Sequence, residues 1–531
     1  MKEQKEHHCL GPPGTGKTTW LSRQVERACE EHDPQFVMVA SFTRAAVAEL
    51  NRRDLPIPEQ NLGTLHALAY RALGHPEICE TGKFLKEWSE EYPRYAMSSG
   101  TREGVDDGFA TGCDGEGDAL LMEYSRLRAL QRDRSYWAPR VTAFAAMWEA
   151  WKKETDRVDF TDLIEKALQE VDRPTCYPMI GFFDEVQDFT PLEIALVRKW
   201  AQTMEQVVLC YDLDQSIYAF KGADPSVLYD PSITPMVLKQ SYRLPRVVQS
   251  AAEKLIGQIG PEYRFQREYL PREEEGAVEK VGQMFSQPER LIEQAAQYAE
   301  QGKSVLFLST CSYMLNPLLT RLREQGIPFS NPYRRRRRDW NPLLKVKNQQ
   351  NAATRVAAFL AAFWRSEPQW TVEELYSWLD LTKGVAKRGW KEKAALLPKD
   401  TYLPIVNLLG IIDMDAILAA HRGKGEWLRD NLSAQWRGTG TFAIKCAERN
   451  ELALHEEPLI MTGTIHSVKG GEADVVFLSP DLSPQGFSQL TDHNVHHRHA
   501  VVRQMYVGVT RAREKLILCA PSTRISFPEW V

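Results

Sequence analysis

The chain has 531 residues, of which 26% are charged and 43% hydrophobic, and its formal net charge is −5. This length suggests two to four domains, and the absence of an overall basic charge means that any nucleic-acid contact would depend on a local groove. No run approaches the roughly 18 apolar residues of a membrane span, residues 1–6 carry no apolar signal segment, and the nine cysteines lack C-x-x-C pairs, so we expect a cytoplasmic protein with reduced thiols.

The first predicted element is a phosphate-binding loop followed by a helix from Thr18 to about Cys29. The pattern G-x-x-x-x-G-K-[ST] is complete, and its residues are Gly11, Pro12, Pro13, Gly14, Thr15, Gly16, Lys17 and Thr18. Its glycines let backbone N–H groups surround phosphates at the positive end of the helix. Lys17 supplies a positive charge to the β- and γ-phosphates, and the Thr18 hydroxyl is a ligand for Mg²⁺. Thr19 is assigned to the same nucleotide site.

Short apolar runs further along the chain predict the strands of parallel sheets. They lie at residues 36–40, 179–183, 207–210, 305–308, 475–478 and 516–519. Stretches of helical character separate these runs, which is typical of α/β layers. Residues 5–10, which include His7 and His8, match a central strand poorly.

Two regions interrupt this alternation. The first is a helical stretch at about 75–155, and it contains a loop at 98–118 that is rich in glycine and acidic residues. Its tryptophans, which we interpret as helix-packing core and not as a platform for DNA, are Trp88, Trp137, Trp148 and Trp151. The second region is helical to about 455 and begins with five arginines at 334–338. These arginines fit a contact to duplex phosphates and a solvated linker equally well.

A group of histidines near the C-terminus invites interpretation as a metal site. Its members are His493, His496, His497 and His499. No cysteine or acidic residue stands at a suitable spacing beside them, so we expect a polar loop.

Polar residues after two of the predicted strands would complete the nucleotide site. Asp184 and Glu185 follow the run at 179–183, and the carboxyl ends of strands lie beside the phosphate loop in a doubly wound sheet. Asp184 is placed to hold Mg²⁺, and Glu185 to orient or deprotonate the attacking water. After the run at 207–210, Gln215 fits a contact to the γ-phosphate, while Phe220 either stacks on a base or packs in the core.

The order of the motifs resembles the UvrD/Rep/PcrA branch of the superfamily-one DNA helicases. In the first half, the matching segments are F-T-R-A-A at 42–46, G-T-L-H-A-L at 63–68, D-F-T-D-L at 159–163, D-E-V-Q-D at 184–188 and D-Q-S-I-Y at 214–218. In the second half, they are Q-S-Y-R at 240–243, T-I-H-S-V-K-G-G-E at 464–472 and Y-V-G-V-T-R-A-R-E at 506–514. The regions at about 75–155 and 330–455 align poorly.

The resemblance implies roles for further residues. Arg243 and Arg511 would reach the γ-phosphate as arginine fingers supplied within one chain. Tyr242 would stack on the adenine, and Glu472 would bind the ribose. The positions that touch single-stranded DNA in the family are occupied here by Phe42, His66, Phe220 and His466. The family reads the adenine edge with a glutamine some twenty residues before the loop, and ten residues precede Gly11 in this sequence, so selectivity between ATP and GTP stays open.

The resemblance also implies a fold class and a domain organisation. We expect an α/β protein with two RecA-like parallel-sheet motor domains, each with a mainly helical insertion. The first motor would comprise residues 1–75 and 155–240 with an insertion at 76–154, and the second 241–330 and 455–531 with an insertion at 331–454. ATP and Mg²⁺ would bind between the two motors.

The activity implied is ATP-dependent movement on single-stranded DNA, 3′ to 5′, with unwinding at junctions between single and double strands. The expected state is a monomer, and protein partners are left open. Two alternatives remain: a translocase that removes bound proteins with little unwinding, because the insertions are short, and a non-catalytic DNA-binding module switched by nucleotide. Intact residues at the catalytic positions argue against the second alternative.

Overall fold

The computed structural model describes residues 6–98, 115–228, 230, 233–265, 267–335, 337–344, 350–364, 369–423 and 425–528. Most of the loop predicted at 98–118 therefore lies outside the described residues. The chain divides into two compact units. Unit 1 comprises residues 1–281, 308–313 and 464–531, and unit 2 comprises residues 282–307 and 314–463.

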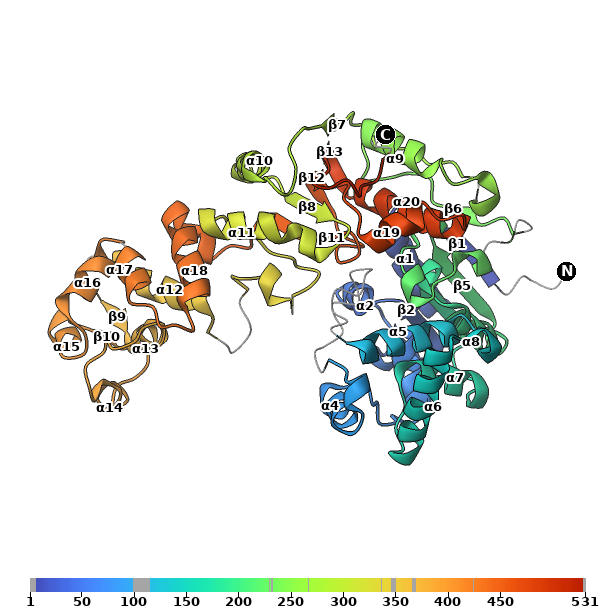
Figure 1. Cartoon of the computed structure of the whole chain (residues 1–531), viewed down its shortest axis with the longest axis horizontal. Helices are drawn as coiled ribbons and strands as arrows, with labels where there is room; N and C mark the ends of the chain where they lie inside the picture. The colour runs from blue at the N-terminus through green and yellow to red at the C-terminus, as the bar shows by residue number, and fades with distance from the viewer. Residues whose placement is uncertain are drawn as a thin grey trace. The chain divides into compact units, whose positions relative to one another are not determined.

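Unit 1 contains a six-stranded parallel sheet with the strand order β3-β2-β4-β5-β1-β6. Figure 1 labels β1, β2, β5 and β6 of this sheet. The strands are β1 (Glu6–Leu10), β2 (Val37–Ser41), β3 (Leu62–Thr64), β4 (Ile180–Asp184), β5 (Gln206–Tyr211) and β6 (Met236–Val237). Consecutive residues of β2 enter different apolar clusters: Val37 and Val39 pack in one, and Met38 and Ala40 in the other. Both faces of the sheet are therefore covered, as is usual for a parallel sheet.

The segment with His7 and His8 forms β1, between β5 and β6, although its composition argued against a central strand. The reason is a polar contact that no local pattern reveals. His8 is buried, with Nδ1 at 2.9 Å from the Tyr211 hydroxyl on β5 and Nε2 at 2.8 Å from a Glu6 carboxylate oxygen. Both ring nitrogens therefore have partners inside the sheet.

Helices surround the sheet, and those that lie within about 75–155 make up the first helical region. They are α1 (Lys17–Glu31), α2 (Arg44–Asn51), α3 (Leu65–Ala72), α4 (Gly82–Glu91), α5 (Glu116–Ala129), α6 (Pro139–Glu154), α7 (Phe160–Glu170) and α8 (Pro191–Ala201). The four tryptophans predicted as core are buried in one cluster with α4, α5 and α6, where Trp88 and Trp148 are 0% exposed. The core interpretation of these tryptophans is confirmed.

A second sheet has the strand order β11-β8-β12-β13-β7, and β12, β13 and β7 pair in parallel. Its strands are β7 (Ala277–Lys280), β8 (Val305–Ser309), β11 (Ile460–Thr464), β12 (Ala473–Leu478) and β13 (Ala512–Leu518). The boundary between the units passes through β8 and β11. Unit 1 also contains α9 (Arg246–Ile256), α19 (Pro484–Leu490) and α20 (Val495–Val509). Two parallel sheets with helices confirm the predicted α/β fold.

Unit 2 is mainly helical. Its helices are α10 (Glu289–Glu300), α11 (Asn316–Gln325), α12 (Ala352–Leu360), α13 (Val372–Leu379), α14 (Trp390–Ala394), α15 (Ile405–Leu409), α16 (Met414–His421), α17 (Gly425–Asp430) and α18 (Arg437–Arg449). Unit 2 also contains a short antiparallel pair of strands, β9 (Trp370–Thr371) and β10 (Tyr402–Leu403). In the part of the chain that the structure describes, no helix is both long and apolar enough to cross a membrane.

The arginines at 334–338 lie in unit 2, and Arg336 is outside the described residues. The Asn341 side chain donates to the carbonyl oxygens of Arg334 and Arg337 at 2.9 and 3.0 Å. The Arg337 guanidinium lies 3.9 Å from the ring centre of Trp340. The described part of this run is thus a folded turn.

The expectation of a polar loop for the C-terminal histidines was wrong for three of the four. His496, His497 and His499 lie in α20, because the Asn494 side chain accepts the N–H of His496 at 3.0 Å and caps the helix. No group of three or more metal-binding side chains occurs among the residues described.

Candidate nucleotide site

The phosphate loop lies between β1 and α1, and its glycines serve two different purposes. Gly14 and Gly16 have φ of +73° and +75°, where a side chain would be strained. A Cβ on Gly14 would also lie 2.4 Å from Arg243 Cβ and 2.8 Å from Ser241 Oγ. Glycine at position 14 therefore permits the segment 241–243 to approach the loop.

Lys17 points toward the carboxylates at the end of β4. Its Nζ lies 2.7 Å from Glu185 Oε1, and its side chain is 8% exposed. Burial lowers the pKa of Lys17, but the charges of Glu185 and Asp184 outweigh it and hold the pKa above its ordinary value. The loop lysine is consequently a buried cation that pairs with the predicted catalytic carboxylate.

The pKa values of the neighbouring carboxylates Asp184 and Glu185 are shifted in opposite directions. Burial and the charge of Glu185 raise the pKa of Asp184 to about 6, against the opposing effect of Lys17. For Glu185 burial is outweighed by the charges of Lys17 and Lys469, which lower the pKa to about 2. Glu185 also adopts a left-handed backbone with φ of +57°, a strained state for a non-glycine residue. Asp184 and the Thr18 hydroxyl are hard oxygen donors, and this donor chemistry fits Mg²⁺.

Gln215 lies against Arg511, although 296 positions separate them. Arg511 Nη2 donates to Gln215 Oε1 at 3.1 Å, and Gln215 Nε2 donates to Asp212 Oδ2 at 2.7 Å. Arg511 is 1% exposed, and its Nε donates to the Val507 carbonyl at 2.8 Å. Both side chains are therefore held by hydrogen bonds on two sides.

Arg243 and Glu472 contact each other directly. Arg243 Nε donates to Glu472 Oε2 at 2.6 Å, and Arg513 Nη1 lies 3.2 Å from Glu472 Oε1. Tyr242 is 73% exposed, and its backbone N–H donates to the Gly14 carbonyl at 2.8 Å. The structure thus places Tyr242 and Arg243 beside the phosphate loop, whereas the carboxylate of Glu472 is engaged by arginines.

Lys469 also belongs to this site, although the motifs implied no role for it. Its Nζ contacts a carboxylate oxygen of Asp188, donates to the Gln215 carbonyl at 2.8 Å and lies 3.6 Å from Glu185 Oε2. Its position within the matched segment 464–472 is the feature of the sequence that could have identified it as a site residue. It joins this segment to Glu185 and to Gln215.

The predicted DNA residues fall into two places. Phe42, Phe220 and His466 surround Tyr218, with ring centres 5.0, 5.9 and 5.8 Å from its ring, respectively. His466 is 4% exposed, and its Nε2 lies 3.0 Å from the Ile217 carbonyl. His66 lies elsewhere, with Nδ1 at 3.5 Å from Glu193 Oε1. Phe42 and Phe220 are half-buried, and His466 supports Phe220 from below the surface.

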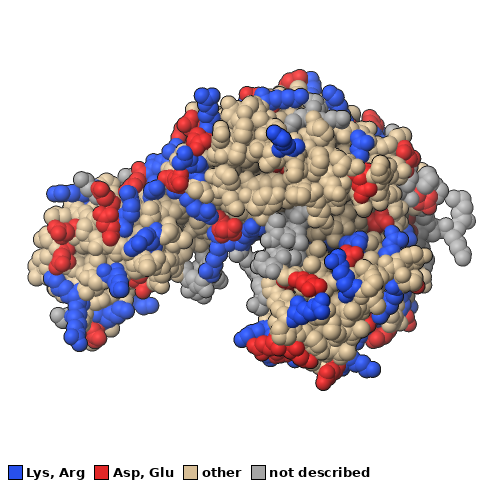
Figure 2. All heavy atoms as spheres, viewed as in Figure 1, with Lys and Arg blue, Asp and Glu red and all other residues tan. Residues whose placement is uncertain are grey.

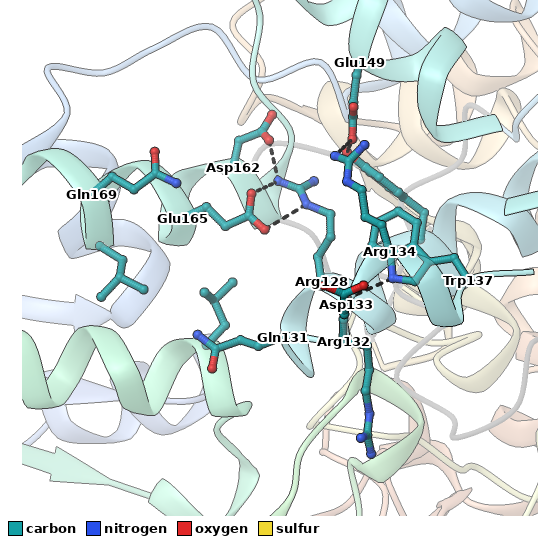
Figure 3. A pocket seen from close by; sticks show the side chains of 13 residues that line it. Arg128, Gln131, Arg132, Asp133, Arg134, Trp137, Glu149, Asp162, Glu165 and Gln169 are labelled. Atoms are coloured by element: carbon teal, nitrogen blue, oxygen red, sulfur yellow. Dashed lines mark hydrogen bonds and ion pairs between the residues drawn. The ribbon is translucent and has the colours of Figure 1, made fainter. Parts of the chain in front are cut away.

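Apart from these residues, unit 1 has a hollow of about 570 Å³ between α5, α6, α7 and α8 (Figure 3). In this view Arg128 points toward Asp162 and Glu165, and Arg134 toward Glu149. None of the predicted site residues lines this hollow.

Comparison with known families agrees with this geometry. A family model described as an AAA domain matches residues 2–221. A second, described as a UvrD-like helicase C-terminal domain, matches residues 459–519, which include Lys469, Glu472 and Arg511. The chain is related to the UvrD-like helicases. The predicted resemblance is confirmed.

Individual relatives of this UvrD-like chain are named as helicases. A putative ATP-dependent DNA helicase YjcD of Bacillus subtilis is 25% identical over 278 residues, ATP-dependent DNA helicase UvrD2 of Mycobacterium tuberculosis 28% over 289, and DNA helicase II of Escherichia coli 26% over 277. Each alignment covers 46% of this chain and, in that order, 36%, 40% and 38% of the relative. The UvrD-like chain thus aligns with less than half the length of these relatives.

Proposed function

We propose that the chain is a DNA-dependent ATPase that moves along single-stranded DNA, 3′ to 5′, and separates strands at junctions. The observation that carries the proposal is the meeting of Arg511 and Gln215 beside the phosphate loop, since it joins groups from distant parts of the chain at one nucleotide site. We also propose the partition into motors at 1–75 with 155–240 and at 241–330 with 455–531, with insertions at 76–154 and 331–454.

Each site residue has a chemical task in this proposal. The N–H groups of the loop and Lys17 bind the phosphates, and Tyr242 stacks on the base. Thr18 and Asp184 hold Mg²⁺, which when bound neutralises charge on the phosphates. Arg243 and Arg511 stabilise negative charge on the transferred phosphoryl group, and such a finger is worth about 10³–10⁵ in rate in other enzymes.

The pairing of Lys17 with Glu185 suggests how turnover depends on nucleotide. The Lys17 ammonium is 2.7 Å from Glu185 and pairs with this carboxylate. Phosphate oxygens compete for the same cation, so nucleotide binding frees Glu185 to accept a hydrogen bond from water. The base thus becomes available only when its substrate is present.

Single-stranded DNA is the proposed activator. The half-buried rings of Phe42 and Phe220 offer faces for base stacking. His466, next to Phe220, is three residues from Lys469, which contacts Asp188 and Gln215. A base on Phe220 is therefore linked through a short segment to the nucleotide site. Over the face drawn in Figure 2, basic and acidic side chains are interspersed, in keeping with local contacts to DNA.

The experiment compares unwinding of duplexes with a 3′ or a 5′ single-stranded tail, with ATP and with GTP. We expect unwinding of the 3′-tailed duplex, and Lys17→Ala should abolish it. A preference for the 5′ tail would contradict the direction of movement. ATP hydrolysis without unwinding of either duplex would favour the protein-removing translocase instead.

A further inference from the structure

Asp214, the residue before Gln215, is a buried carboxylate with cationic partners on both oxygens. It is 2% exposed. Arg264 donates to it from Nε at 3.1 Å and from Nη2 at 2.9 Å, and Arg267 Nη1 contacts its Oδ2. Two arginines thus compensate one buried charge, which would otherwise be costly.

Arg267 extends this contact to the helix that precedes Arg511. Its side chain is 3% exposed, and its Nη2 donates to the Tyr506 hydroxyl at 3.1 Å and to Glu253 Oε1 at 3.2 Å. Tyr506 is in α20, which ends two residues before Arg511. Burial lowers the pKa of Arg267, but Asp214 and its other acidic neighbours hold it well above the ordinary value, so the guanidinium stays charged.

These contacts form a closed ring that begins and ends at Gln215. Gln215 follows Asp214, Asp214 binds Arg267, Arg267 binds Tyr506, and the helix of Tyr506 leads to Arg511, which donates back to Gln215. The two groups assigned to the γ-phosphate are therefore joined twice, once directly and once through Arg267. A lysine could not reproduce this, because a guanidinium serves three acceptors with a rigid planar fork.

We propose that Arg267 is a positioning residue that fixes Gln215 against Arg511 and thereby sets the rate of ATP hydrolysis. The proposal rests on the ATPase activity proposed above. Its consequence is specific: loss of Arg267 should lower kcat and leave nucleotide binding nearly unchanged, because the hydrogen bonds of Arg267 go to Asp214, Glu253 and Tyr506 and not to the phosphate loop.

The experiment measures DNA-stimulated kcat, the KM for ATP and the Kd for a fluorescent ATP analogue. The variants are Arg267→Gln, Arg267→Lys, Asp214→Asn and the double variant Asp214→Asn with Arg267→Gln. Lys239→Gln is the matched control, since Lys239 pairs with Glu268 at an exposed site of the same part of the chain.

We expect Arg267→Gln to lower kcat by about 10- to 100-fold with the Kd within about twofold, and Arg267→Lys to recover only part of the loss. The double variant should be no slower than Arg267→Gln, since both changes break one contact. The double variant removes the Asp214 carboxylate together with the Arg267 guanidinium, so it leaves less uncompensated buried charge. Its kcat can therefore be compared with that of the wild type even if Arg267→Gln alone unfolds. Lys239→Gln should match the wild type.

Three outcomes overturn the proposal. If Arg267→Gln has the kcat of the wild type, the positioning role is overturned and the proposed function is unaffected. A parallel loss of kcat and analogue binding in the folded Arg267→Lys variant would mean a purely structural role. Absence of turnover by the wild-type protein would overturn the proposed function, and this inference with it.

Discussion

Arg511 Nη2 donates to Gln215 Oε1 at 3.1 Å, so a guanidinium near the C-terminus contacts the amide that follows β5 of the first sheet. Arg511 is almost fully buried and is held by carbonyl groups as well. Hydrogen bonds within the protein therefore fix its position, and a charge held in this way can stabilise a transition state without reorganisation.

Removal of this guanidinium should slow hydrolysis more than binding. We expect Arg511→Ala to lower kcat by about 10³-fold, with a much smaller change in the KM for ATP, because the charge acts mainly on the transition state. Steady-state ATP hydrolysis measures this. Arg449→Ala, at an exposed site in α18, should behave as the wild type. If Arg511→Ala weakened ATP binding by the same factor as it lowered kcat, the role of Arg511 as an arginine finger would be contradicted.

The aromatic group around Tyr218 should contribute to DNA affinity. Phe220→Ala removes a stacking face and should weaken binding of single-stranded DNA by about 1–3 kcal/mol, or roughly 5- to 150-fold in Kd. Fluorescence anisotropy with a labelled oligonucleotide measures the change. The control is Tyr177→Ala, since Tyr177 is exposed and belongs to none of the matched motifs. Unchanged affinity would mean that Phe220 is a packing residue.

The contact between α7 and the preceding helices should be a major source of stability. Asp159 is 0% exposed, and its Oδ2 lies 2.9 Å from Arg128 Nη1 and 2.5 Å from Lys152 Nζ. Asp159→Asn leaves these cations with less compensation and should cost about 3 kcal/mol in the free energy of unfolding, measured with urea. Glu90→Gln, at an exposed pair with Lys86, should cost less than about 0.5 kcal/mol. Equal effects of the two changes would contradict this account.

His499 should make the stability of the protein depend on pH. Burial and the nearby charges of Arg503, His496 and Arg498 lower its pKa to about 4, whereas an unfolded histidine titrates near 6.5. The folded state therefore binds fewer protons between these values, and stability present above pH 6.5 is lost as the pH falls toward 4. His499→Gln should reduce the difference between urea midpoints at pH 7 and pH 5. His497→Gln, at a half-exposed position, should retain the difference.

Contiguous motifs predicted much of the fold and of the candidate site. The glycine-rich loop, the carboxylates after β4 and the alternation of strands and helices depend on residues close together in sequence, where spacing is informative. The strand with His8 was missed because its stability depends on Tyr211, 203 positions away. Arg267 and the pairing of Lys17 with Glu185 were missed for the same reason: their significance lies in contacts that the fold creates. The helix α20 was not predicted because the first residues that follow its cap, Asn494, are mainly polar and were interpreted as a loop.

The central claim is that the residues around the phosphate loop form an ATPase that DNA activates. Its most direct test is ATP hydrolysis with and without a single-stranded oligonucleotide, by the wild-type protein, by Lys17→Ala and by Lys86→Ala, a control at an exposed site in α4. We predict that DNA raises turnover by the wild type and by Lys86→Ala, and that Lys17→Ala shows none. Equal turnover with and without DNA, or activity that survives in Lys17→Ala, would contradict the account.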